Sequence, residues 1–433
     1  MKKVVLAAAL AVGSFVPALA FAATDVFGTS QELDGSYSLR RTTTEQFDPI
    51  RGQSVLTRPR PDFDPVPITF SSFNIYPSLD AGIEYNDNIF AQQKFHTSDT
   101  PLSLYPGINA QSNWGRHALA ITAGGNISYY PWNNQQNFNN ATVQMEGRYD
   151  IAERTWADFT TGYQRVTELR GNPSTPASQA GPSQYNLYSG SAVVNRSVGV
   201  IQAKGFYDTA YYQYAPFDLI GGGTFDQSAR NRVQNDLGGE VSYNAVENLK
   251  PYAGVTYNWH DYVNSGARNS NGYKADVGAR MDFGGVTTAQ AYIGYMQQDY
   301  FNFVHNNVNA IDYGADVLWN VTTLTSVEGK AARSIEESTS GLAPAYINNM
   351  GKVTVSHELM RNTILQAGVT YNGLEYEGIT QHDDFYNVMG AARYYFNRNL
   401  HTDLTYNYER KESSVAGNDF DQHSIMLRVG FQY

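Results

Sequence analysis

The chain has 433 residues and a formal net charge of −11, with 32 tyrosines, 38 glycines and no cysteine. The lack of cysteine excludes disulfides, so stability must come from hydrogen-bonded architecture and packing. The acidic balance gives no support to nucleic-acid binding, and no nucleic-acid partner is predicted.

The first 22 residues read as an export signal. Met1-Lys2-Lys3 is a short positive region, and an apolar stretch from Val4 to Val16 follows it. That stretch is too short and wrongly flanked for a membrane-spanning helix, and no later window offers about 18 uninterrupted apolar residues. We expect cleavage at the small-residue site formed by Ala20, Ala22 and Ala23. Cleavage removes two lysines and no acids, which takes the net charge from −11 to −13.

Residues 23–72 differ in kind from the rest of the chain. The run from Arg58 to Pro67 contains prolines that lack an N–H donor and fix φ, so it cannot join a β-ladder. The stretch from Thr24 to Gln53 is polar and has no sustained period. The sequence therefore predicts a flexible, Pro-rich leader, and the alternative is a plug or a docking segment for a partner.

From Phe73 onward one unit repeats: an amphipathic run, a tight turn, a second amphipathic run and a long polar loop. The tight turns lie near 114–116, 152–154, 196–197, 246–248, 284–285, 321–322, 360–361 and 397–398. The long loops cover roughly 86–102, 130–138, 166–184, 213–228, 262–271, 299–308, 336–345, 375–383 and 411–420. The two kinds alternate strictly, and nine loops that each join two strands predict 18 strands.

Each run carries apolar residues on alternate positions, as in Leu400, Leu404 and Tyr406 against His401 and Asp403. Short turns on one side and long loops on the other are typical of an outer-membrane barrel, whereas a soluble sandwich has no reason to segregate its connections. The negative mean hydropathy of −0.43 is compatible with this reading, because only the outward half of each strand must be apolar. We therefore predict an all-β fold, a closed antiparallel transmembrane barrel of about 18 strands over residues 73–433.

The alternate, charged positions would face the lumen, since a Lys or Arg facing the bilayer centre costs about 2–4 kcal/mol. The predicted lumen-lining residues carry both signs: Glu146, Arg148, Glu240, Lys274, Asp276, Arg280, Asp312, Asp316, Lys352, Glu358, Arg393, Asp403 and Arg428. A barrel this wide is not filled by side chains alone, so a water-filled channel is expected unless loops plug it. The alternative is that these charges only solvate the lumen and pair across strands.

The last strand ends the chain on an aromatic residue. Its alternate apolar positions are Ile425, Leu427, Val429, Phe431 and Tyr433. This pattern resembles the C-terminal signature that the outer-membrane assembly machinery recognises, so we predict that these residues are the assembly signal.

An enzyme is not predicted. There is no cysteine, no G-x-S-x-G elbow and no H-E-x-x-H, and the eight histidines are scattered. His423 and Ser424 are adjacent on a strand, so they point to opposite faces and cannot cooperate directly. Asn86-Asp87-Asn88 lacks the rest of an EF-hand and is read as a turn, and Gly221-Gly222-Gly223 is read as a flexible loop. No metal and no cofactor are expected; the loops, rich in amides and tyrosine, suit either carbohydrate or plain hydration.

The segment from Val55 to Phe90 carries a family resemblance. Arg58-Pro59-Arg60-Pro61, Tyr76-Pro77-Ser78 and Tyr85-Asn86-Asp87-Asn88-Ile89-Phe90 resemble the opening of the putative β-barrel porin 2 family, and the turn Trp114-Gly115-Arg116-His117 and aromatic C-terminus fit its organisation. Several members come from capsule or exopolysaccharide loci, so the resemblance implies a role in moving or anchoring an exported polysaccharide. We therefore predict a channel that takes part in polysaccharide export.

Two alternatives stay open: a general or sugar-selective diffusion porin, and a structural or adhesion barrel without transport. The expected location is the outer membrane of a Gram-negative bacterium, with both termini in the periplasm. The expected partners are outer-membrane lipid and lipopolysaccharide, the assembly machinery, periplasmic polysaccharide-export proteins and a polysaccharide chain.

Overall fold

The computed structural model describes residues 53–168, 170–172, 179–301, 307–338 and 343–433. In this part of the chain, strands joined by turns and loops account for nearly all regular structure, with three short 3₁₀ turns, η2 (Asn134–Gln136), η3 (Ser228–Arg230) and η4 (Gly266–Arg268). Helices long and apolar enough to cross a membrane do not occur among the described residues.

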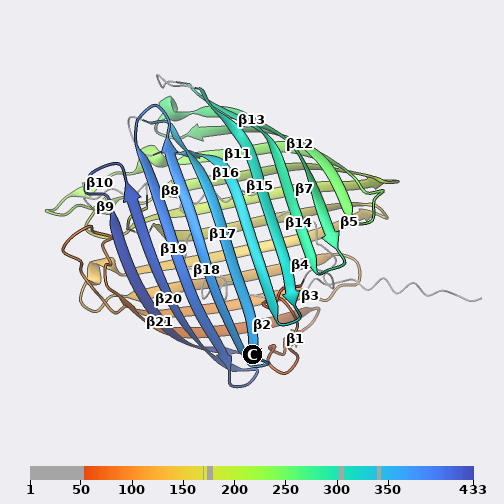
Figure 1. Cartoon of the computed structure of the whole chain (residues 1–433), viewed down its shortest axis with the longest axis horizontal. Coiled ribbons are helices and arrows are strands. Elements are labelled where there is room, and N and C mark those ends of the chain that lie inside the picture. The colour runs from red at the N-terminus through yellow and green to blue at the C-terminus, as the bar shows by residue number, and fades with distance from the viewer. Residues whose placement is uncertain (1–52, 169, 173–178, 302–306, 339–342) are drawn as a thin grey trace, which may run out of the picture.

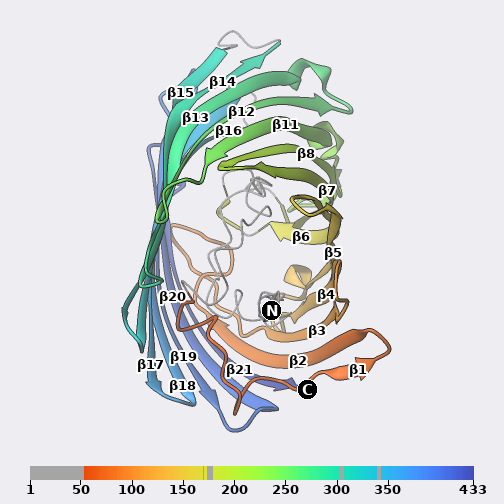
Figure 2. The same cartoon turned by 90° about the vertical axis from the view of Figure 1, so that its right-hand side faces the viewer.

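Eighteen strands form one closed antiparallel barrel (Figures 1 and 2). Each strand pairs with its neighbours in sequence, and β2 and β21 close the ring from Ser78 opposite Gln432 to Asn86 opposite Ser424. The strands are β2 (Phe73–Asn86), β3 (Leu102–Ser112), β4 (Ala118–Tyr129), β5 (Phe138–Ala152), β6 (Thr155–Glu168), β7 (Ser183–Val198), β8 (Ile201–Tyr214), β11 (Arg232–Tyr243), β12 (Leu249–Tyr262), β13 (Ser270–Phe283), β14 (Thr287–Tyr300), β15 (Asn307–Thr322), β16 (Thr325–Glu337), β17 (Ala345–Met360), β18 (Thr363–Tyr376), β19 (His382–Tyr395), β20 (Leu400–Ser413) and β21 (Phe420–Gln432). The ring of strands is closed, which confirms the predicted fold class.

The connections divide between the two ends of the barrel. Short turns such as 153–154, 284–286 and 361–362 lie at one end, called the turn end below, and long connections such as 87–101 and 215–231 lie at the other, the loop end. The turn end also holds the C-terminus (Figure 1). The predicted alternation of turns and loops is therefore confirmed.

The connection after β8 contains a small hairpin of β9 (Phe217–Asp218) and β10 (Thr224–Phe225). Gly221, Gly222 and Gly223 form its tip with φ of 95°, 100° and 92°, in the left-handed region that favours glycine. The triple glycine thus has a local backbone reason at this turn.

Side chains alternate between the two faces of the wall. On β21, Leu427 and Val429 point outward and are 49% and 48% exposed, whereas Met426 and Arg428 point inward and are 8% and 2% exposed. All five residues of the predicted assembly signal lie on the outward face. Contact with water would make this apolar outer face unfavourable, because removal of apolar surface from water is the main favourable contribution to folding. Contact with lipid tails removes that cost.

The wall is doubled at one place at the loop end. Among the described residues, β15 pairs with β16 only from Gly314 opposite Ala332 to the turn, so their loop-end segments separate. Residues in the outward register of β16 and β17 then pack against inward residues of β14 and β15. This overlap contains the apolar residues Met296, Tyr300, Val308, Ala310, Ile335, Ala345 and Ile347. Ala345 and Ile347 are buried here at 0% and 5% exposure, although their strand register alone would place them on the lipid face.

A short strand precedes the barrel. β1 (Ile68–Phe70) pairs with the first residues of β2, from Ile68 opposite Ile75 to Phe70 opposite Phe73. Ser71, at φ of 55°, makes the turn between them. The chain therefore reaches the barrel wall at the turn end, next to the C-terminus (Figure 1).

Candidate functional site

The inner wall is where the strands bring polar and charged side chains together. All thirteen predicted lumen-lining residues occupy inner-face positions of their strands. The structure pairs Glu240 with Arg280 and Asp403 with Arg393, whereas Arg148 pairs with Asp150 at 3.0 Å rather than with Glu146. The predicted set is thus spread around the wall and forms separate groups.

One group joins four consecutive strands, β11 to β14. Both oxygens of Glu240 on β11 accept hydrogen bonds from Arg280 on β13, each at 2.9 Å. The Arg280 guanidinium lies 4.2 Å from the ring centroid of Tyr252 on β12, and the Tyr252 hydroxyl accepts a hydrogen bond from Gln290 at 3.0 Å. A bidentate carboxylate and an aromatic face together fix the guanidinium in one plane.

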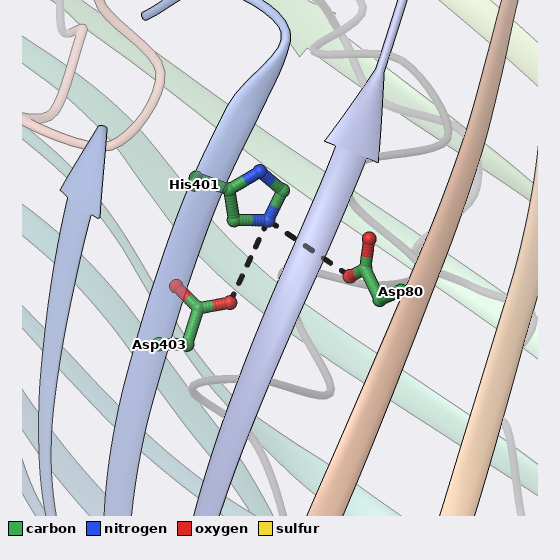
Figure 3. A group of neighbouring side chains, drawn as sticks. All are labelled: Asp80, His401 and Asp403. Atoms are coloured by element: carbon green, nitrogen blue, oxygen red, sulfur yellow. Dashed lines mark ion pairs between the residues drawn. The ribbon is translucent and has the colours of Figure 1, made fainter. Parts of the chain in front are cut away.

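A second group lies at the closing seam of the barrel and is called the seam cluster. It comprises Asp80 of β2, Arg393 of β19, His401 and Asp403 of β20, and Arg428 of β21. Arg393 donates two hydrogen bonds to Asp403, from Nε to Oδ1 at 2.6 Å and from Nη2 to Oδ2 at 3.0 Å. The Arg428 guanidinium lies 3.8 Å from Asp80. His401 Nε2 lies 3.9 Å from Asp80 and 3.7 Å from Asp403 (Figure 3). All five residues are at most 4% exposed.

The seam cluster has the ligand types of a metal site but not its electrostatics. His401, Asp80 and Asp403 offer ligand atoms that lie within 4.8 Å of one another. However, both oxygens of Asp403 are already bound by Arg393, and Arg428 faces Asp80. Two guanidinium groups balance the two carboxylates, so a dication would add an uncompensated charge in a buried position. The arrangement supports an ion-paired cluster that joins the first and last strands.

A third group, at the loop end, stacks arginines on tyrosines. The Arg230 guanidinium lies 3.8 Å from the Tyr214 ring centroid, and Arg232 lies 4.2 Å from that of Tyr212. Arg230 also donates two hydrogen bonds to Glu168, at 2.6 and 3.0 Å. Such cation–π contacts are strongest where the guanidinium is shielded from water.

A buried carboxylate lies in the overlap of β16 and β17 with β14 and β15 and accepts hydrogen bonds from neighbouring strands. Glu337, near the end of β16, accepts hydrogen bonds from the hydroxyls of Tyr262 at 2.8 Å and Tyr300 at 3.3 Å. His260 Nδ1 lies 2.7 Å from the same carboxylate. These partners come from β12 and β14, so Glu337 connects the outward face of β16 with the strands that cover it.

Loops at the loop end are bound to one another. Asp99 accepts hydrogen bonds from the backbone and side chain of Asn133 at 2.9 and 2.8 Å. Gln136 donates to the carbonyl of Ala180 and accepts from Arg170 at 3.0 Å. Burial lowers the pKa of Arg170 to about 10, which leaves the guanidinium protonated at neutral pH. The described parts of three successive loops are therefore linked by hydrogen bonds.

The structure supports the turn reading of Asn86-Asp87-Asn88. Asn86 Oδ1 accepts from the backbone of Asn88 at 2.9 Å, Asp87 Oδ1 from that of His423 at 2.7 Å, and Asn88 Oδ1 from that of Gln92 at 3.0 Å. These oxygens cap backbone N–H groups rather than face a common point. His423 itself lies against Tyr406, whose hydroxyl is 2.9 Å from Nδ1.

The turn end contains the described part of the leader. The backbone N–H of Val55 donates to Ser326 Oγ at 2.7 Å, and Val55 is 2% exposed. Arg58 and Arg60 both reach Glu358 on β17, at 2.5 and 3.5 Å. Residues 23–52 lie outside the described residues, but the contacts of residues 53–64 show a docked segment where the sequence predicted a flexible one.

Further contacts hold the same segment. The Phe63 ring centroid lies 5.7 Å from that of Tyr395, and the Phe63 carbonyl accepts a hydrogen bond from Gln432 at 3.0 Å. Leu56 packs against Met389 and Ala391. All these partners lie on the inner face of β19 and β21, so the segment lies inside the barrel.

Several site residues escaped the sequence reasoning. Asp80, His401, Glu337 and Arg230 were not among the predicted lumen-lining residues. Asp80 and His401 do follow the alternation of their strands, so this signal was available. The predicted cleavage site at Ala20, Ala22 and Ala23 lies outside the described residues.

The closed strand ring, the apolar outer belt and the charged inner wall define an outer-membrane, porin-like β-barrel channel. The sequence model of the putative beta-barrel porin 2 family matches residues 60–433, so the chain belongs to this family, as its opening residues predicted. Fold and family favour a channel over an enzyme.

A comparison with solved structures gave matches at low identity. The crystal structure of Pseudomonas aeruginosa OpdK with vanillate is 10% identical, with 83% of this chain and 99% of that chain covered and a TM-score of 0.46. A BenF-like porin from Pseudomonas fluorescens Pf-5 is 8% identical, with 84% and 100% covered and a TM-score of 0.46. A comparison with curated proteins found no significant match.

Proposed function

We propose that the barrel is a passive outer-membrane channel for carbohydrate, and that its cargo is an exopolysaccharide or capsular chain leaving the cell. In this proposal the loop end faces the exterior, and the turn end, with both termini, faces the periplasm. Periplasmic polysaccharide-export proteins would deliver the chain, while lipopolysaccharide would surround the loop end. The outer-membrane assembly machinery would insert the barrel through its last strand.

The chemistry of the inner wall is the observation that carries this proposal. Inward positions combine tyrosines, such as Tyr76 and Tyr292, with amides such as Gln144 and Gln164, and all four side chains are only partly buried. A sugar ring offers hydroxyls around its edge and an apolar face, so it can match both groups in one contact. The charges on the wall are largely paired, which suits a neutral or weakly charged cargo more than a strongly anionic one.

A sugar-selective diffusion porin is the second candidate. The observation in its favour is that residues 53–64 lie inside the turn end while three loops are bound together at the loop end. A small saccharide passes such an arrangement more easily than a long chain. In this reading the same inner wall selects solutes that enter the cell.

Planar-bilayer recordings test the channel itself. The purified protein should give steady ion current, and added oligosaccharide should block that current in a concentration-dependent way. A barrel that gives no current, with or without residues 23–72, would support a structural or adhesion role.

Gene deletion separates the two cargo directions. Loss of surface polysaccharide with normal sugar uptake would support export. Unchanged polymer with slower uptake of small sugars would support the diffusion porin and contradict export.

A further inference from the structure

We infer that the inner wall at the turn end is a receptor site for an arginine–proline peptide, and that residues 54–64 of the chain occupy it as an intramolecular plug. This inference rests on the proposed channel function, because a plug has meaning only in a conducting barrel. The segment lies on inner-face residues of β16, β17, β19 and β21. It therefore takes up lumen space at the end where the C-terminus lies (Figure 1).

The site is selective for arginine. Glu358 receives two guanidinium groups, from Arg58 at 2.5 Å and Arg60 at 3.5 Å, and its side chain is 12% exposed. Arg58 also donates to the carbonyl of Thr323 in the turn after β15. One acid that binds two cations, with a carbonyl beside it, makes Glu358 the electrostatic anchor of the segment.

The segment is also held in shape by contacts within itself. Its backbone turns on itself, since the N–H of Phe63 and that of Asp64 both donate to the carbonyl of Arg60, at 2.8 and 2.7 Å. Asp64 also accepts from the backbone N–H of Arg60 at 2.5 Å. Pro59 and Pro61 fix φ on either side of Arg60. A preorganised segment loses less entropy on docking, which favours the occupied state.

Cysteine labelling tests docking without reference to current. The chain has no cysteine, so Val55→Cys introduces a single thiol at a position that is 2% exposed. Maleimide should react slowly with this variant, and Glu358→Gln should accelerate labelling roughly tenfold or more, as loss of a charged hydrogen bond predicts. Glu153→Gln is the matched control, because it removes an exposed acid from the 153–154 turn at the same end of the barrel, away from the inner wall and with no described contact with residues 53–64.

Conductance then tests the plug. Glu358→Gln should raise single-channel conductance or open probability, and Glu153→Gln should not. A disulfide between Val55→Cys and Ser326→Cys, formed in the Glu358→Gln background, should restore the lower current until it is reduced. Heat-modifiable mobility in detergent gels checks that every variant has folded.

The outcomes are distinguishable. Fast labelling of Val55→Cys in the otherwise native chain would overturn docking, whatever the current. Faster labelling in Glu358→Gln with unchanged current would overturn the plug and leave the channel in place. No current in any variant, including one that lacks residues 53–64, would remove the channel and the plug together.

Discussion

Replacing Asp403 by asparagine should destabilise the barrel strongly. Asp403 is 1% exposed and receives two hydrogen bonds from Arg393, which is 4% exposed. Asparagine keeps the shape but removes the charge, so the seam cluster keeps two arginines against one remaining acid, Asp80. Breaking a buried ion pair by removal of one partner costs about 3–5 kcal/mol, because the other charge stays buried.

The assay is reversible urea unfolding of the barrel in lipid vesicles, followed by tryptophan fluorescence. Glu412→Gln is the control on the same strand, since Glu412 pairs with Arg410 at 2.5 Å but both side chains are about half exposed. An exposed pair contributes about 0.2–1 kcal/mol, so this variant should stay close to the native free energy of unfolding. Replacing both Arg393 by methionine and Asp403 by leucine should recover most of the loss.

A result in which Asp403→Asn and Glu412→Gln lower the free energy of unfolding equally would refute this reasoning. It would mean that the seam cluster is hydrated enough to tolerate an unpaired charge. If the double variant does not recover stability, the Arg393–Asp403 pair stabilises the rest of the seam cluster by more than its own charge balance.

Three further predictions concern other parts of the wall. Leu427→Arg, on the outward face, should lower the free energy of unfolding by about 2–4 kcal/mol in the same vesicle assay. Glu337→Gln should lower the free energy of local opening at the overlap by about 1–3 kcal/mol. Hydrogen–deuterium exchange should then be faster at the loop ends of β14 and β15 and unchanged in β3 and β4. Tyr252→Phe should cost about 1 kcal/mol through loss of the Gln290 hydrogen bond, and urea unfolding with Gln290→Ala as a second variant would show whether the two losses are coupled.

Local patterns explain why the wall was predictable from the sequence. Alternation over a strand depends on neighbouring residues only, so the inward position of Arg428 and the outward position of Leu427 follow directly from residue types. The alternation of short and long connections is equally local, and it gave the strand number.

Contacts between distant segments had no comparable signal. Asp80 and Arg428 are neighbours only because the first and last strands close the ring, and Arg58 meets Glu358 only because the leader enters the barrel. The prolines correctly excluded residues 58–67 from the ladder but did not indicate where the segment would bind. At the overlap, the strand register assigns Ile347 to lipid, and only the separation of β15 from β16 explains its burial.

Seam charges also bear on how an incomplete chain behaves. Until the final strand is in place, Arg393 balances Asp403 at one edge of the open sheet, whereas Asp80 at the other edge lacks Arg428 and leaves an excess negative charge there. Arrival of Arg428 neutralises that edge at the moment the ring shuts. Closure of the barrel is thereby coupled to charge balance at the seam. A polypeptide truncated before its last strand would have neither a closed barrel nor a neutral seam.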